Sequence, residues 1–163
     1  MPDHLEPLIP ILYAVRDAIN SATLPHRIQA EVSYFGVDTP LENLHGQTVV
    51  EVGFDDVGEV EWRTRSQVDL RVDVVVGIRH QFAPHEDGLQ GGVDRSAVES
   101  MLDLQAAIRQ TLKAIADLPT SGFAASVQLS PPTIHSSYNR KHLRELRQFT
   151  GIIVYSFTVV VDD

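Results

Sequence analysis

One long alternating run constrains the fold more than any other part of this sequence. Apolar residues occupy every second position from Val68 to Ile78, and charged residues fill several of the positions between them. Alternation over that length predicts a β-strand from Gln67 to His80 with one face turned toward a core. The apolar face consists of Val68, Leu70, Val72, Val74, Val76 and Ile78, and the other face carries Asp69, Arg71, Asp73 and Arg79.

The length of this strand has an architectural consequence. A strand rises about 3.3 Å per residue, so residues 67–79 extend roughly 43 Å. A compact domain of this size has a diameter of about 40 Å. The strand therefore crosses the whole domain, and an extended chain that begins as early as Glu59 must bend or project. A projecting ribbon needs support, for which a neighbouring subunit is the obvious candidate.

Composition bounds the class of protein. A chain of 163 residues with 43% hydrophobic and 21% charged residues predicts a single globular domain over residues 1–163. The absence of cysteine excludes disulfides and thiolate chemistry. The first residues lack the pattern of a signal peptide, and no apolar run reaches the ~18 residues of a membrane span. A net charge of −9 argues against a general nucleic-acid binder, because such binding is mostly phosphate neutralisation.

Periodicity and turn signals predict an α+β fold. We expect a mixed, mostly antiparallel sheet of about five to six strands with a long β-hairpin, packed by two helices. The nearly unbroken apolar run of the last strand indicates a central position with both faces buried. Asp94 or Ser96 is the expected N-cap of the second helix. The predicted helices are Leu8–Asn20 and Arg95–Asp117, and the predicted strands are 27–35, 48–54, 60–64, 67–80, 123–129 and 151–161.

A hairpin is predicted between the strands 48–54 and 60–64. The segment Asp55–Glu59 contains aspartate and glycine, which favour turns. A five-residue loop there pairs Phe54 with Val60 and keeps the apolar side chains on one face. The same register sets Glu51 opposite Arg63 as a cross-strand ion pair.

Short catalytic motifs are absent from the sequence, including phosphate-binding glycine loops and zinc-protease motifs. A metal site is one interpretation of the cluster His80, His85, Glu86 and Asp87, because these side chains bind zinc. A solvated glycine-rich loop is the favoured interpretation, since nothing fixes the geometry of those ligands. The loops 36–46 and 81–92, with His45 as a further member, offer a pocket if the protein is instead an enzyme or a ligand-binding protein.

A basic segment and an acidic segment stand apart in the sequence. The basic segment consists of Arg140, Lys141, Arg144 and Arg147, and helical spacing places its three arginines on one face. Three interpretations stay open for it: a solvated surface, a phosphate-binding patch, or a docking patch for an acidic partner. The acidic counterpart in the same chain consists of Glu51, Asp55, Asp56, Glu59 and Glu61. Contact between these segments in neighbouring copies would be head-to-tail, the kind of contact that closes into rings. Trp62 is expected in the core or in a subunit contact.

The layout of elements resembles the tail-terminator (tail-completion) proteins of long-tailed bacteriophages. The segments that carry the resemblance are LIPILYAVRDAIN, RSQVDLRVDVVVGIR, SAVESMLDLQAAIRQTLKAIADL and GIIVYSFTVVVD. The resemblance implies a structural virion protein, assembled in the host cytoplasm, that forms a hexameric ring at the head-proximal end of the tail tube. Such a ring ends tail polymerisation and joins the tail to the head.

The same resemblance sets the expected partners. They are further copies of the chain, the tail tube protein and a neck or head-completion protein, while DNA passes through the ring without specific binding. No catalytic residue, cofactor, metal or membrane is implied. The alternatives are another neck component, such as a head-completion or stopper protein, and a small soluble α+β enzyme or ligand-binding protein.

Overall fold

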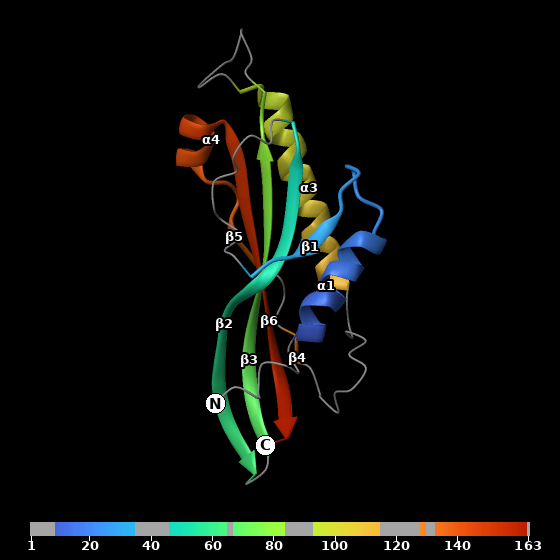
Figure 1. Ribbon diagram of the computed structural model, residues 1–163, viewed down its shortest axis with the longest axis vertical. Helices are drawn as coiled ribbons and strands as arrows, with labels where there is room; N and C mark the ends of the chain where they lie inside the picture. Colours follow the sequence, from blue (N-terminus) through green and yellow to red (C-terminus); the bar gives the residue numbers. More distant parts are fainter. Residues whose placement is uncertain are drawn as a thin grey trace.

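The computed structural model is an α+β protein built on one mixed sheet (Figure 1). It describes residues 9–34, 46–64, 67–83, 93–114, 128–129 and 133–162. The described helices are α1 (Ile9–Ser21), α3 (Arg95–Ala114) and α4 (Arg140–Leu146). The described strands are β1 (Ala30–Val32), β2 (Thr48–Thr64), β3 (Gln67–Gln81), β4 (Gln128–Leu129), β5 (Thr133–Ser136) and β6 (Gln148–Asp162).

The sheet is organised around three long strands. Its order is β1-β2-β3-β6-β4, and β5 also pairs with β6. Only the β1–β2 pair is parallel among these described strands, so the sheet is mixed. β3 pairs along its whole length with β6, from Gln67 opposite Asp162 to Gln81 opposite Gln148. The long strand predicted from the alternation at 67–80 is therefore confirmed.

The core lies on one face of the sheet. The side chains of β3 that the alternation assigned to the apolar face are fully buried from Val72 to Ile78. α1 and α3 cover this face with the apolar stripes expected of amphipathic helices. Their buried apolar side chains are Ile11, Leu12, Val15 and Ile19 on α1, and Met101, Leu104, Ile108 and Leu112 on α3.

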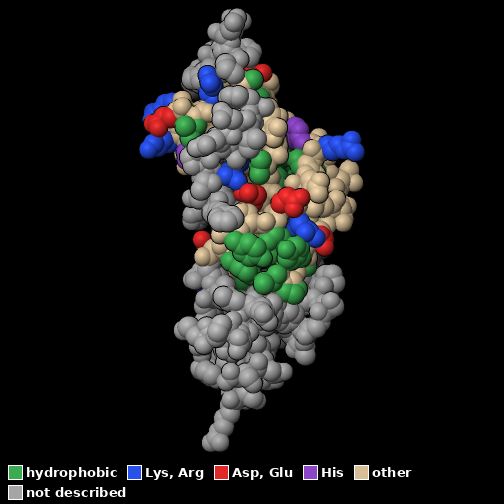
Figure 2. Space-filling model, viewed as in Figure 1, with side chains coloured by type: hydrophobic (Ala, Val, Ile, Leu, Met, Phe, Trp, Pro, Cys, Tyr) green, Lys and Arg blue, Asp and Glu red, His purple; other side chains and the backbone are tan. Residues whose placement is uncertain are grey.

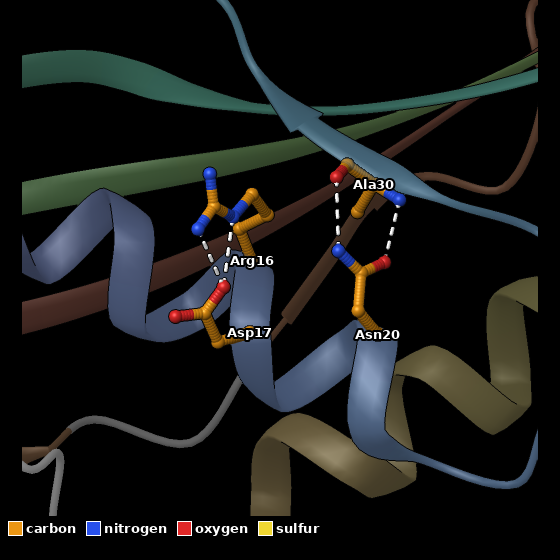
Figure 3. Close-up of polar contacts among 4 residues, drawn as sticks. All are labelled: Arg16, Asp17, Asn20 and Ala30. Atoms are coloured by element: carbon orange, nitrogen blue, oxygen red, sulfur yellow. Dashed lines mark hydrogen bonds and ion pairs between the residues drawn. The ribbon is translucent and has the colours of Figure 1, made fainter.

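Two local devices fix the helices. Asp94 caps α3, because its carboxylate accepts a hydrogen bond from Ser96 N at 3.0 Å, so Asp94 rather than Ser96 is the N-cap. At the end of α1, the Asn20 amide binds both backbone groups of Ala30, with Nδ2 donating to the carbonyl and Oδ1 accepting from the N–H (Figure 3). This clamp holds the short strand β1 against α1 and beside β2.

The long strands continue beyond the helices. Figure 1 shows β2, β3 and β6 extending well past the ends of α1 and α3, while α4 lies near the opposite end of the molecule. We call the part formed by β2 residues 56–64, β3 residues 67–72 and β6 residues 157–162 the ribbon. The long strands therefore continue past the described helices, but the single extended chain considered from Glu59 onward is not formed, because the chain reverses between Thr64 and Gln67.

The predicted turn at Asp55–Glu59 is wrong. β2 runs without a break from Thr48 to Thr64, and the chain reverses between Thr64 and Gln67 instead. Phe54 lies opposite Val74 rather than Val60. The turn-forming residues are accommodated by register shifts at Phe54/Asp56, Glu59/Glu61 and Trp62/Thr64. Such bulges absorb an extra residue and increase the local twist, so pairing with β3 overrides the local turn signal.

Other predictions are met in part. The expected strand at 27–35 is limited to β1, the strand at 123–129 is described only at β4, and β5 and α4 were not predicted. The last strand does lie inside the sheet, but its faces differ. Ile153 and Tyr155 are buried, whereas Ile152 and Val154 are only half-buried. Its unbroken apolar run therefore reflects one buried face and one partly covered face.

Candidate assembly surfaces

The predicted basic segment forms an exposed helix. Arg140, Lys141 and Arg144 are all exposed on α4. The only ion pair described on this helix joins Arg144 Nη2 to Glu145 Oε1 at 3.7 Å, with 76% and 49% of the two side chains exposed. An exposed pair of this kind contributes little free energy. We call the three exposed basic residues the α4 surface. Leu146, which is 37% exposed, adds an apolar side chain at the end of the same helix.

α4 is held firmly against the start of β6. Asn139 precedes the helix as its N-cap, and its side-chain oxygen accepts a hydrogen bond from His142 N at 3.0 Å. The Asn139 N–H donates to the Thr150 carbonyl at 2.9 Å. His142 Nδ1 lies 2.9 Å from Thr150 Oγ1. These contacts give the α4 surface a fixed position relative to the sheet.

Arg147 does not share the helical face with Arg140 and Arg144. It adopts a left-handed conformation, with φ at 50°, and ends the helix. Its carbonyl accepts a hydrogen bond from Phe82 N at 2.8 Å. The left-handed residue lets the chain reverse directly into β6. The predicted three-arginine face is therefore wrong at its third member.

The acidic segment divides into different environments. Glu51 forms an ion pair with Arg79, and only 19% and 6% of the two side chains are exposed. The predicted partner Arg63 is wrong, because Glu51 lies opposite Gly77 in the β2–β3 register. Because Glu51 is paired with Arg79 within the protomer, we do not count it among the acidic side chains of the docking surface. Asp55 is exposed.

The remaining predicted interface residues are placed by their backbone. Asp56 lies opposite Asp73, Glu61 opposite Asp69, and Trp62 opposite Val68. Glu59 lies opposite Leu70. These four side chains are outside the described part of the structure, so the interpretation of Trp62 as a core or subunit contact stays a prediction. The register nevertheless assigns three carboxylates to the ribbon, directly after exposed Asp55.

Two histidines that lie far apart in the sequence each contact a hydroxyl group, and they influence one another electrostatically. His80 Nδ1 lies 2.8 Å from Thr48 Oγ1. His26, from the α1–β1 connection, has its Nε2 2.7 Å from Ser100 Oγ on α3. Burial lowers the pKa of His80, and the nearby His26 lowers it further. Sequence reasoning missed the contact between His26 and Ser100, because 74 residues separate them.

These imidazoles do not assemble a metal site within the described ranges. No group of three or more potential metal ligands occurs there. His45, His85, Glu86 and Asp87, the other members of the predicted site or pocket, fall outside the described residues. His80 acts as a tie between β3 and the start of β2, through its contact with Thr48.

Comparison of the chain with models of known protein families and with curated protein sequences finds no match in either set. None of the helices in the described ranges has the length and apolar character needed to cross a membrane.

Proposed function

We propose that this chain is a structural virion protein that forms a ring at the head-proximal end of a phage tail tube. The ring ends tail polymerisation and joins the tail to the head. The observation that carries the proposal is the three-stranded ribbon, which continues beyond the helices (Figure 1). The layout of elements that resembles tail terminators supports the same assignment.

The size of the ribbon favours assembly. β3 contains 15 residues, which correspond to about 50 Å of extended chain. That length exceeds the diameter of about 40 Å expected for a compact domain of this size. Strands that extend past the described helices gain stability when a face or an edge packs on another molecule. A neighbouring copy provides such a surface at every position of a ring.

The distribution of charge favours head-to-tail contact. The α4 surface is basic, whereas Asp55 and the ribbon are acidic. A two-fold contact between ribbons would bring like charges together. A heterologous contact instead pairs opposite charges, and complementary charge guides register and orientation.

The fold also sets the stagger that this contact requires. α4 immediately precedes Gln148, which lies opposite Gln81, whereas Asp56 lies opposite Asp73. These levels are eight residues apart along β3, or about 26 Å. Neighbouring copies must therefore be staggered along the strand direction for the two charged surfaces to meet. In a closed ring, this stagger requires strands that are inclined to the ring axis.

A lumen lined in part by carboxylates suits a passage for DNA. Retention of DNA comes mainly from neutralised phosphates, so an acidic lining lets the polyanion slide. The proposal assigns part of the acidic surface to the lumen and the α4 surface to a contact with a subunit or with a neck protein. Other neck proteins are distinguished from a terminator by which virion component they bind.

Native mass spectrometry, followed by electron microscopy of the assembled fraction, tests the proposal. We expect a closed oligomer for the natural chain, alone or after addition of tail tubes. The double variant Arg140→Glu with Arg144→Glu should shift the population to monomer, while Arg27→Glu, at an exposed position away from α4, should assemble normally. A chain that stays monomeric at high micromolar concentration, both alone and with tail tubes, contradicts the ring. Unchanged assembly of the double variant removes the α4 surface from the interface.

A further inference from the structure

The outer edge of β2 is covered over only a short distance in the described part of the structure. β1 pairs with Val50, Glu51 and Val52, and Ser33 N donates to the Val52 carbonyl at 2.9 Å. From Gly53 to Thr64, none of the described strands pairs with β2 on the side away from β3. An open edge of this length presents a row of backbone donors and acceptors to another chain.

The register shows which residues of β2 present those groups. Val52 directs its carbonyl toward β1, and it lies opposite Val76 of β3. Backbone direction alternates along a strand, so residues opposite the even-numbered positions of β3 face outward. The bulge at Asp55 adds one residue to β2 but none to β3, so β2 residues opposite even-numbered β3 positions still face outward beyond the end of β1. The outward-facing positions are therefore Phe54, opposite Val74, then Val57, opposite Val72, and Glu59, opposite Leu70.

Charge and bulges make this edge unsuitable for pairing with its own copy. Two β2 edges side by side would bring together the four carboxylates of each chain, from Asp55, Asp56, Glu59 and Glu61. Like charges across a strand pair are destabilising. Bulges further protect an edge from open-ended stacking. The edge is thus selective for a strand of opposite charge, and the basic segment of this chain is helical instead.

Apolar side chains flank the point where β1 leaves the edge. Val32 and Phe54 are half-buried against the core, and Tyr34, just after β1, is 61% exposed. Figure 2 shows hydrophobic side chains gathered at about mid-height on the face of the molecule that it draws. An added strand that paired with β2 beyond β1 would begin beside Val32, Phe54 and Tyr34.

We propose that β2, from Phe54 to Trp62, accepts an extended lysine- or arginine-rich segment of another protein as an added β-strand. Backbone hydrogen bonds along the open edge hold the segment, and the carboxylates of β2 select its charge. The apolar flank gives the start of the added strand a place to pack. This inference shares the β2 carboxylates with the proposed ring contact, but it requires only the edge within one protomer and can be tested without assembly.

Fluorescence anisotropy with labelled peptides tests this inference. The probe is a ten-residue peptide of alternating lysine and valine. Its matched control carries an N-methyl group on every residue, which removes the backbone donors of both edges and leaves the charge unchanged. A glutamate–valine peptide tests the choice of charge. We expect the first peptide to bind at least tenfold more tightly than either control. Equal binding of the methylated peptide would mean charge attraction without strand pairing, and would overturn the inference.

The protein offers a matched pair of variants at one outward-facing position. Val57→Pro removes an outward N–H without removing a donor from the β2–β3 ladder, whereas Val57→Thr keeps that N–H. We expect at least a tenfold loss of binding for the proline variant and less than a twofold change for the threonine variant. If the proline variant fails to fold, hydrogen exchange of the natural chain replaces it: the peptide should slow exchange at the Phe54, Val57 and Glu59 amides. Unchanged exchange there counts against the added strand.

The same assay on the Arg140→Glu, Arg144→Glu variant separates the two proposals. Its β2 edge is unaltered, so peptide binding should persist even where assembly is lost. Loss of peptide binding in this folded variant contradicts a site confined to the β2 edge, while the mass measurement reports on the ring alone.

Discussion

Replacing Gly151 by alanine should destabilise the protein through a close contact between α3 and the sheet. A Cβ at position 151 would meet the Gln105 amide nitrogen in a clash, with Phe149 Cε1 at 3.0 Å and Gln105 Cδ at 3.1 Å. An end of a long side chain usually swings away, but Gln105 is only 1% exposed. The added methyl group must therefore displace buried atoms.

The size of the effect follows from the cost of overpacking. Inserting a methyl group into a packed core costs about 1–3 kcal/mol, and the lower chain entropy of alanine offsets up to about 1 kcal/mol. We expect a net loss of about 1–2 kcal/mol. In a protein of this length, 1 kcal/mol corresponds to roughly 2–4 °C in Tm, so the Tm should fall by about 2–8 °C in differential scanning calorimetry.

A double-mutant cycle identifies the clash as the cause. Gln105→Ala removes the obstructing amide, so adding Gly151→Ala to that variant should lower the Tm much less than it does in the natural chain. Gly46→Ala is the control. Gly46 has φ at +75° and open space around its Cβ position, so its cost comes from the left-handed backbone and should not depend on Gln105. An unchanged Tm for Gly151→Ala, or the same decrease in both backgrounds, would refute the reasoning.

Two further predictions concern the ties around the core. Burial lowers the pKa of His80 in the folded protein below the ordinary histidine value of 6.5. As the pH falls through 6.5, the unfolded chain therefore binds a proton at His80 more readily than the folded protein does. The free energy of unfolding should decrease as the pH falls from neutral through this value. His80→Gln should flatten that pH dependence in urea titrations from pH 7.5 to 5, and an identical pH profile in this variant would exclude His80 as its source. Asn20→Ala removes both hydrogen bonds to Ala30 and should cost about 1–3 kcal/mol, measured by urea unfolding. Aspartate at position 20 keeps only the acceptor and should recover part of the loss, whereas equal stability of the alanine variant would contradict a structural role for the clamp.

Hydrophobic periodicity in the sequence correctly predicted β3, α1 and the start of α3. The alternation from Val68 to Ile78 identified β3 and its buried face, because a strand with one face in the core must place apolar side chains at every second position. Helical spacing of apolar residues located α1 and the start of α3, because a helix with one face in the core places apolar side chains three or four positions apart. The exposed basic residues of α4 were also recognised, although their helix was not.

Pairing between distant segments was less predictable. Asp55–Gly58 has the composition of a turn, but it lies within the long β2–β3 ladder and is extended. Glu51 forms its ion pair with Arg79 rather than with Arg63. The position at which the chain reverses between β2 and β3 determines which residues lie opposite one another. Arg147 was expected to share a helical face with Arg140 and Arg144, but it adopts the left-handed conformation that ends α4 and leads into β6.

By itself, the sequence determined the long strand β3, the amphipathic helices and the opposite charges of the α4 surface and the ribbon, because these properties depend on residue type and short-range spacing. Tertiary structure alone decided that β2 passes through its turn signal, that Glu51 pairs with Arg79 inside the protomer, and that none of the other described strands pairs with the outer edge of β2 beyond β1. The physical reason is that strand pairing and edge exposure depend on which segments meet in space, and many different pairings satisfy the same local periodicity.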